Sequence, residues 1–458
     1  MMSITVQIAL LGFVPFALVL FALMPARRAL IATYLSGWLL LPQSGFQLSG
    51  LPDYDKPAAI AIGALLGVLV LDAKRMTTFR FRWFDLPILM FCLWPLASHV
   101  YNGHGAITGL NWVIAHMFLW GVPYFLGRVY FRNADDLREL AIGIFIGGLA
   151  YAPLCWWEIR MSPQLHRQLY GFFPHSFLQH IRYGGFRPIV FMQHGIMVGV
   201  WMACATVVGF WLWRSRTLMK LGSIPMAVLV PFMFITTVFC KTGSAVVAMG
   251  LALCVFVGTR WAPRMPVLLV FALIPAIYLA ARTTGAWDGE GMLAVMESID
   301  AERAGGIRGR MRQEKYYVAR AMESPLFGFA DSDFIPRDDE GNRVLRGNDG
   351  FWIITFGLYG GVSLIAVFTA LALPLLLVAK RHRHGEMMAS AGAPATALAI
   401  VVVLFAIDCL PNGMINPIYL LAAGAVSSAV SGVAVSTTKV GAPRLARVRI
   451  APVSNVVR

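Results

Sequence analysis

A succession of long apolar runs, separated by short polar or basic stretches, constrains this chain more than any other feature. Each helical crossing of a bilayer needs roughly 20 mostly apolar residues. Of the residues, 58% are hydrophobic and 13% charged, which is typical of an integral membrane protein. The sequence therefore predicts an all-α polytopic membrane protein with about 13 transmembrane helices. The runs lie at residues 4–24, 29–41, 58–71, 84–98, 110–125, 140–157, 189–213, 224–239, 244–257, 265–281, 351–378, 395–410 and 415–432.

Basic residues alternate along the chain in a way that predicts its orientation. They follow the odd-numbered runs, whereas the alternate short loops contain little more than Lys56 and Lys241. Short basic loops stay in the cytoplasm, so we expect an external N-terminus and a cytoplasmic C-terminus. The first run is expected to be an anchor rather than a cleaved signal peptide, because Arg27 and Arg28 follow it instead of preceding it.

The cysteines and the net charge narrow the function classes. All six cysteines fall within or at the edge of apolar runs, and no pair has the spacing of a metal site, so neither disulfides nor zinc are expected. The formal charge is +15, and most of it lies at cytoplasmic loop ends, where it meets anionic headgroups. The lipid bilayer is therefore an expected partner, and nucleic acid is not.

Two hydrophilic segments depart from the rhythm of helix and short loop, and both fall on the predicted external side. They divide the chain into N-terminal membrane helices (1–282) with a smaller external segment (158–188), a large external loop (283–348) expected to contain short amphipathic helices, and C-terminal membrane helices with a basic tail (349–458). Because a basic loop is unusual outside the cytoplasm, the large loop is expected to bind an anionic substrate such as a lipid-linked phosphate or pyrophosphate.

The smaller external segment mixes arginines, histidines and aromatic residues. Aromatic faces beside hydrogen-bonding side chains suit sugar rings. An interfacial amphipathic helix with an aromatic belt is the alternative interpretation of the same residues.

Several short motifs together resemble the superfamily of O-antigen ligases and Wzy-type polysaccharide polymerases. Gly309–Arg310 are followed after 14 residues by P-L-F-G-F, and then by N-D-G-F-W-I-I-T-F-G-L-Y-G-G, which begins at Asn348. The stretch R-P-I-V-F-M-Q-H-G at 187–195 resembles another external element of that family, and C-K-T-G-S at 240–244 resembles its short basic turn. Each motif is short, but the order of the motifs, their spacing and their predicted side of the membrane match those of the family.

The resemblance implies a glycosyltransferase in the bacterial inner membrane that uses an undecaprenyl-pyrophosphate-linked glycan at the outer face. No cofactor is expected. No metal is expected either, because the predicted external segments lack a cluster of carboxylates and histidines at ligand spacing and arginines can stabilise the leaving pyrophosphate. Arg187 and Arg310 are expected to stabilise the leaving pyrophosphate, because a guanidinium can bind it through two hydrogen bonds. Arg312, Lys241 and Arg320 are expected to assist in substrate binding. For each of these residues, a headgroup contact or a solvated loop charge is the alternative.

A base for the acceptor hydroxyl is expected at Asp349 or His194. Ligases of the family carry a histidine where this chain has Asn348–Asp349, and this departure favours the polymerase reaction, with Asn348 contacting the substrate. Asp349 could accept a proton if its pKa rises at the membrane interface. Alternatively, Asn348 and Asp349 cap the following helix, and His194 is a packed hydrogen-bonding residue.

The sequence thus predicts a polymerase of a bacterial surface polysaccharide, which transfers a glycan to a lipid-linked repeat unit. Its partners would be the lipid-linked oligosaccharide and, in the cell, a flippase and chain-length regulators. The alternatives are a ligase with a different acceptor and a secondary transporter of an anionic solute. Apart from Asp408, few acidic residues lie in the apolar runs. This scarcity argues against the transporter, because transporters use such residues within the membrane.

Overall fold

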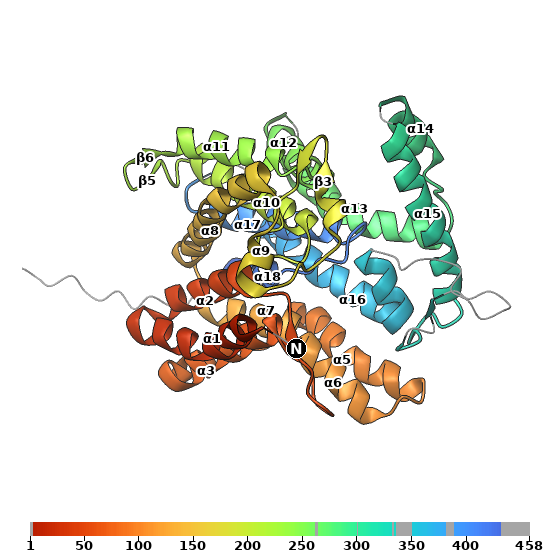
Figure 1. Cartoon of the computed structure of the whole chain (residues 1–458), viewed down its shortest axis with the longest axis horizontal. Helices are drawn as coiled ribbons and strands as arrows, with labels where there is room; N and C mark the ends of the chain where they lie inside the picture. Colours follow the sequence, from red (N-terminus) through yellow and green to blue (C-terminus); the bar gives the residue numbers. More distant parts are fainter. Residues whose placement is uncertain are drawn as a thin grey trace, which may run out of the picture.

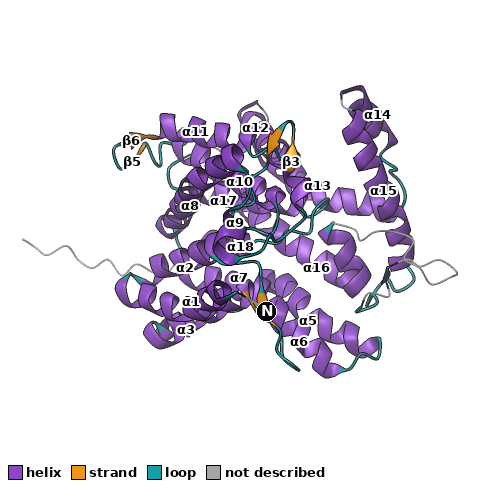
Figure 2. Ribbon diagram, viewed as in Figure 1, coloured by secondary structure: helices purple, strands orange, loops and turns teal. Residues whose placement is uncertain are grey.

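The computed structural model describes residues 3–261, 264–299, 301–331, 334–335, 350–381 and 389–431. Within these ranges the chain is mostly helical (Figures 1 and 2). Its strands form three hairpins, each of which pairs two strands of two residues. Asn348 and Asp349 lie outside the described residues. The hairpins pair β1 (Gly45–Phe46) with β2 (Tyr54–Asp55), β3 (Ile181–Arg182) with β4 (Gly185–Phe186), and β5 (Lys220–Leu221) with β6 (Ile224–Pro225).

The helices follow the apolar runs closely. A π-helical turn, η2 (Met117–Gly121), joins α6 to α7, and the short 3-10 helices are η1 (Trp83–Asp85) and η3 (Phe177–His180). The α-helices are α1 (Ile4–Leu23), α2 (Ala26–Leu40), α3 (Lys56–Leu71), α4 (Ala73–Met76), α5 (Leu86–Tyr101), α6 (Ala106–His116), α7 (Val122–Tyr130), α8 (Ala134–Met161), α9 (Leu165–Tyr170), α10 (Gly195–Arg214), α11 (Met226–Phe239), α12 (Gly243–Trp261), α13 (Arg264–Thr283), α14 (Glu290–Ile299), α15 (Ala301–Ala321), α16 (Phe351–Arg381), α17 (Ala393–Asp408) and α18 (Pro417–Val430).

The lengths and composition of these helices are those of a membrane protein. Within the described ranges, seven helical stretches are long and apolar enough to cross a bilayer, and five shorter helices are also apolar. The predicted all-α architecture, with several helices long and apolar enough to span a membrane, is confirmed, whereas the number of 13 crossings stays a prediction. The seven are Ile4–Leu23, Trp83–Tyr101, Ala106–Tyr130, Ala134–Met161, Gly195–Arg214, Met265–Thr283 and Phe351–Arg381.

The helices divide into a buried centre and an apolar periphery. In the most apolar 18-residue segment of α10, 89% is buried inside the protein. In the corresponding segments of α1 and α13 only 28% is buried, because their large apolar side chains face outward. Glycines allow the closest helix contact: a Cβ atom on Gly127 would lie 2.2 Å from the carbonyl oxygen of Leu421, and one on Gly424 would lie 2.0 Å from that of Tyr124. Small residues that let two backbones approach are typical of helix packing in membranes.

The loop between α13 and α16 contains more regular structure than the sequence indicated. Its α15 has 21 residues, and with α14 it forms a helical hairpin at one end of the molecule, beside α13 and α16 (Figure 1). A buried ion pair joins α15 to α13, with Arg282 Nε donating to Glu314 Oε2 at 3.1 Å. The Tyr278 hydroxyl donates to the same carboxylate oxygen at 2.9 Å. These bonds fix the base of the hairpin.

Candidate functional site

Two of the motifs recognised in the sequence meet at Arg187. This residue follows the β3–β4 hairpin and is only 8% exposed. Its Nε and Nη2 atoms donate to the carbonyl oxygen of Lys241 at 3.3 and 3.2 Å. Lys241 has a left-handed backbone (φ 52°), and its Nζ donates to the carbonyl oxygens of Arg182 and Tyr183 at 3.0 and 3.3 Å. The elements at 187–195 and 240–244 therefore form one unit.

The charge of Arg187 has no carboxylate beside it in the described part of the chain. Its guanidinium donates its hydrogen bonds to a carbonyl oxygen. Burial lowers the pKa of Arg187 to about 10, and the positive charge of Arg182 adds to this shift. The guanidinium is still protonated at neutral pH. Burying a charge without a counter-ion is costly, and such groups concentrate at functional sites. An anionic ligand would compensate this charge.

A carboxylate that the sequence did not single out holds the turn after Arg187. Glu158 is fully buried near the end of α8, and its Oε2 accepts hydrogen bonds from the amides of Ile189 and Val190, each at 2.7 Å. Its Oε1 accepts from the amide of Leu165 at 2.9 Å. Glu158 thereby binds backbone donors, and it positions the segment that carries Arg187.

His194 caps α10 with one ring nitrogen and uses the other nitrogen as well. Its Nδ1 accepts from the amide of Ile196 at 3.0 Å, and its Nε2 lies 3.3 Å from Gln179 Oε1. The ring centroids of His175 and His180 are 4.7 and 4.9 Å from its own. Burial, and then His180, lower the pKa of His194 to about 3. The ring is therefore neutral, and its lone pair is engaged in the cap; the role of general base stays a prediction.

His180 supports the same turn in a defined tautomer. Its Nδ1 lies 3.0 Å from the carbonyl oxygen of Ser176, which can only accept, so Nδ1 carries the proton. Its Nε2 then accepts from the amide of Gly195 at 3.3 Å. Burial lowers the pKa of His180 to about 4, and Arg187 contributes to this shift. Two neutral histidines therefore stand beside the buried guanidinium.

The loop after α17 connects this unit to the start of α16. Asn412 is 2% exposed, and its Nδ2 donates to Ser244 Oγ at 3.2 Å and to Asp408 Oδ1 at 2.8 Å. Its carbonyl oxygen accepts from the amide of Phe351 at 3.3 Å. The beginnings of α12 and α16 are thus joined through one residue, by the side chain and the backbone carbonyl of Asn412. Asn348 and Asp349, which precede α16, lie outside the described residues.

The arginines of the α14–α15 hairpin have different surroundings. Arg310 is exposed and lies one helical turn before the buried Glu314, whereas Arg312 is exposed on the other side of α15. Arg320 forms an ion pair with Glu323, and its guanidinium lies 4.2 Å from the ring centroid of Phe329. Glu314 contacts Tyr278, whose ring centroid is 6.0 Å from that of Trp352 at the start of α16. The helix that carries Arg310 is therefore anchored next to the first turn of α16.

The P-L-F-G turn packs against a bend in α16. Gly360 interrupts the helix with a backbone that a side chain would strain (φ 74°). At this bend, the amide of Gly361 donates to the carbonyl oxygen of Pro325 at 2.7 Å. The carbonyl oxygens of Gly357 and Leu358 accept from the amides of Phe329 and Ala330 at 2.9 and 2.8 Å. The bend thus releases backbone groups that the loop satisfies, as backbone groups inside a membrane protein require.

The structure brings Arg187 and Lys241 together and joins them, through Asn412, to the helix that follows Asn348–Asp349. It places Arg310, Arg312 and Arg320 on one helix, α15. In the described ranges, no three histidine, cysteine or acidic side chains are grouped closely enough to hold a metal ion. Comparison of the sequence with protein-family models found no match, and comparison with curated proteins found none either.

Proposed function

We propose that this protein is a glycosyltransferase that polymerises a surface polysaccharide from lipid-pyrophosphate-linked repeat units. The observation that carries the proposal is the buried Arg187 guanidinium, which has no carboxylate beside it in the described part of the chain. It lies where two separate motifs of the family resemblance meet. A buried cation of this kind suits a leaving anion better than it suits a structural role.

The proposed reaction breaks the bond between the anomeric carbon of the donor glycan and its pyrophosphate oxygen. An acceptor hydroxyl forms the new glycosidic bond, and its proton passes to a base. Arg187 and Arg310 stabilise the departing pyrophosphate by charge-assisted, two-pronged hydrogen bonds. Arg312, Arg320 and Lys241 add positive charge around it, and Asn348 contacts the glycan.

We assign the base to Asp349, with His194 as the alternative. The lone pair of His194 is engaged in capping α10, so this residue would need the cap to open before it could accept a proton. Asp349 precedes α16, whose first amide is bonded to the same loop that contacts Ser244. The helix that follows Asp349 and the unit that contains the buried arginine are therefore joined through Asn412.

The proposed reaction side requires a definite topology. We propose about 13 crossings in a bacterial inner membrane, with the N-terminus and the α14–α15 hairpin outside and the C-terminus inside. The five shorter apolar helices and α2 would supply the crossings beyond the seven long ones. Reporter fusions after Thr284 and after Arg381 should report opposite sides of the membrane. The same side for both would overturn this topology.

Elongation of a single defined substrate tests the function. Purified protein in lipid nanodiscs, given only the lipid-linked repeat unit of its host, should build a ladder of longer lipid-linked chains. An Arg187→Ala variant, purified in parallel, serves as the inactive control. Transfer that appears only after lipid A–core or another terminal acceptor is added would indicate the ligase reaction instead. Uptake of an anionic solute by vesicles that lack any lipid-linked glycan would indicate the transporter.

A further inference from the structure

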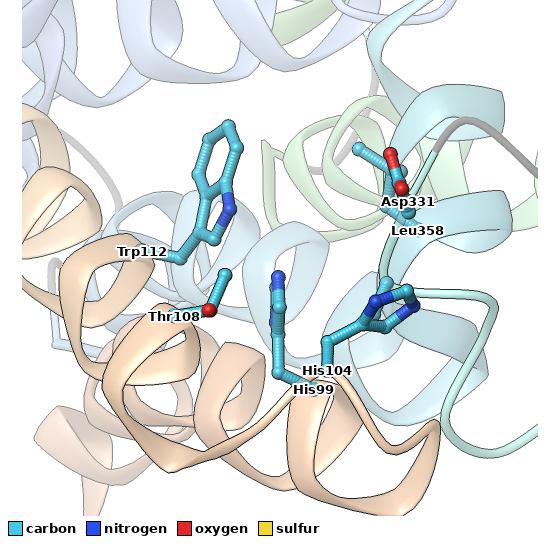
Figure 3. Close-up of a pocket in the computed structure, with 7 residues that line it drawn as sticks. His99, His104, Thr108, Trp112, Asp331 and Leu358 are labelled. Carbon is cyan, nitrogen blue, oxygen red and sulfur yellow. The ribbon is translucent and has the colours of Figure 1, made fainter. Parts of the chain in front are cut away.

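A cavity of about 220 Å³ lies beside the bend in α16, next to Leu358. It is lined by residues of α5, α6 and the turn between them, of the loop before α16, and of α16 itself. Figure 3 shows Trp112 and Thr108 on one wall, Asp331 and Leu358 on the opposite wall, and His99 and His104 at the base. Pockets for drug-sized ligands start at roughly 300 Å³, so this cavity suits a single small ring.

The wall at Asp331 is built by the loop that packs on α16. Ala330 has a left-handed backbone (φ 58°), which is strained for a residue with a side chain. Its amide is held by the carbonyl oxygen of Leu358 at 2.8 Å. From α5, Ser98 Oγ donates to the carbonyl oxygen of Phe327 at 2.6 Å, and Asn102 Nδ2 donates to that of Gly328 at 3.0 Å. The strained residue directly before Asp331 is thus fixed from two sides.

His99 presents a hydrogen-bond acceptor to this cavity. Its Nδ1 lies 2.7 Å from the carbonyl oxygen of Pro95, so in the neutral ring Nδ1 carries the proton and Nε2 carries the lone pair. The ring is buried within α5 apart from the edge that lines the cavity, and it lies 6.3 Å from the ring of Trp112, at an interplanar angle of 29°. Trp112 is 44% exposed, so part of its indole ring is open to a ligand.

The chemistry of the lining selects for a neutral, hydroxyl-rich ring. The seven lining residues include a carboxylate, two imidazoles and a hydroxyl, and none of them is a lysine or an arginine. Such a set accepts hydrogen bonds from hydroxyl groups and disfavours a pyrophosphate. The indole adds an apolar face on which the C–H groups of a sugar can pack.

We propose that this cavity binds one sugar residue of the acceptor glycan. The assignment to the acceptor rests on the proposed function, because the donor pyrophosphate would occupy the basic site at Arg187. Binding of a sugar by the cavity does not itself depend on catalysis, so the two proposals can fail separately. Asp331 and His99 would accept hydrogen bonds from the hydroxyl groups, while Trp112 covers one face of the ring.

Direct binding measurements test the cavity. The probe is the repeat-unit oligosaccharide released from the host's exported polymer, titrated into the full-length protein in nanodiscs and followed by saturation-transfer NMR. Trp112→Ala should weaken binding about tenfold, the effect of losing an aromatic stacking face. Asp331→Asn, at an exposed position, should also weaken it. Trp157→Ala is the matched control, since Trp157 is 52% exposed and lies near the end of α8 that is predicted to be external.

The outcomes separate this proposal from the proposed function. Wild-type protein that elongates the lipid-linked repeat, but binds the oligosaccharide as tightly after Trp112→Ala and Asp331→Asn as before, would overturn the cavity while the polymerase stands. Binding that depends on both residues, in a protein that makes no ladder, would retain the cavity and overturn the polymerase. Absence of any oligosaccharide binding by the wild type, or an equal loss in Trp157→Ala, would overturn the cavity as a sugar site.

Discussion

The carbonyl oxygen of Leu326 lies 2.2 Å from the position that a Cβ atom on Gly360 would occupy. Only a residue without a side chain allows the P-L-F-G turn and the bend of α16 to come this close. The P-L-F-G motif and the glycines of α16 therefore form one backbone contact, although about 30 residues separate them in the sequence. Gly328 makes a similar close approach, since a Cβ atom on it would lie 2.5 Å from the carbonyl carbon of Leu358.

The first prediction follows from this contact. Gly360→Ala should lower the free energy of unfolding by about 2–4 kcal/mol, because it adds a clash to a strained φ of 74°. Gly250→Ala in α12 is the control, since a Cβ atom there meets nothing within 4 Å and should stabilise the helix slightly. Thermal unfolding of both variants in detergent measures the difference. Equal unfolding temperatures would contradict the close contact.

The second prediction separates stability from function at Arg187. Arg187→Met should raise the free energy of unfolding by about 1 kcal/mol, since it removes a buried charge that no carboxylate compensates, and it should abolish elongation. Arg182→Met, five residues earlier and exposed, should leave stability nearly unchanged. Unfolding temperatures and the polymer ladder are measured on the same preparations. A strong destabilisation by Arg187→Met would make the guanidinium a structural group.

The third prediction concerns the shape of the Arg310 guanidinium. Arg310→Lys should slow elongation on the order of 100-fold, nearly as much as Arg310→Ala, because lysine retains the charge but loses the two-pronged hydrogen bond. Arg308→Lys is the control on the same helix, where the arginine pairs with Glu297 at 2.9 Å. Initial rates with the lipid-linked repeat measure both. Wild-type turnover by Arg310→Lys would reduce Arg310 to a general surface charge.

The fourth prediction tests the cap at His194. Asparagine is among the best N-cap residues, so His194→Asn should fold normally and retain elongation within a few-fold. His194→Ala should lower the free energy of unfolding by about 1 kcal/mol, because the amide of Ile196 loses its acceptor. Unfolding temperatures and elongation rates distinguish the variants. A well-folded His194→Asn protein without activity would identify His194 as the base.

The fifth prediction is the pH dependence of stability around the histidine cluster. The pKa values of His194 and His180 are lowered to about 3 and about 4 by burial, with His175, Arg187 and Arg182 adding to the shift. In the unfolded chain a histidine titrates near about 6.5. The contribution of these two neutral histidines to the free energy of unfolding is therefore fully present above that pH. It is lost as the pH falls toward 4, because only the unfolded state then binds the protons. The loss is up to about 1.4 kcal/mol per pH unit for each histidine.

This dependence is best measured as a difference between proteins. Burial raises the pKa of Glu314, which acts in the opposite direction and is common to the wild type and the variants. His180→Asn and His194→Asn should flatten the decline of the unfolding temperature between pH 6.5 and 4.5. Wild-type and variant curves that run parallel would show that the cluster does not titrate in this way.

Hydropathy alone located the helices well, because lipid exposure and burial both favour apolar side chains over the same length of chain. The run at 4–24, for example, corresponds to α1 (Ile4–Leu23). Hydropathy did not predict the bends within helices. The run at 351–378 predicted a continuous helix, whereas Gly360 interrupts α16. A glycine within an apolar run looks the same whether the helix bends there or not.

The long helix α15 was underestimated for a different reason. Its buried stripe is helical in spacing, but Glu314 stands in the middle of it and breaks the apolar pattern. Its partner Arg282 lies 32 residues earlier in the chain, and a pairing over that separation leaves no local trace. Buried polar residues such as Glu158 and Asn412 were missed likewise, because a single polar residue near an apolar run does not reveal what it contacts. The stripe consists of Met311, Glu314, Tyr317, Val318 and Ala321.

The bend in α16 also joins the loop at residues 325–330 and the helix into a single structural unit. The carbonyl oxygens of Gly357 and Leu358 and the amide of Gly361 are bonded to the loop, and Leu358 also accepts from Ser98 Oγ. Undocking the loop would therefore leave the Gly357 carbonyl and the Gly361 amide without these partners. Each unpaired group costs about 1–3 kcal/mol, and a detached loop would therefore favour a straightened helix. Because α16 continues beyond the bend to Arg381, a displacement of the loop would change the angle at which this second segment leaves Gly360.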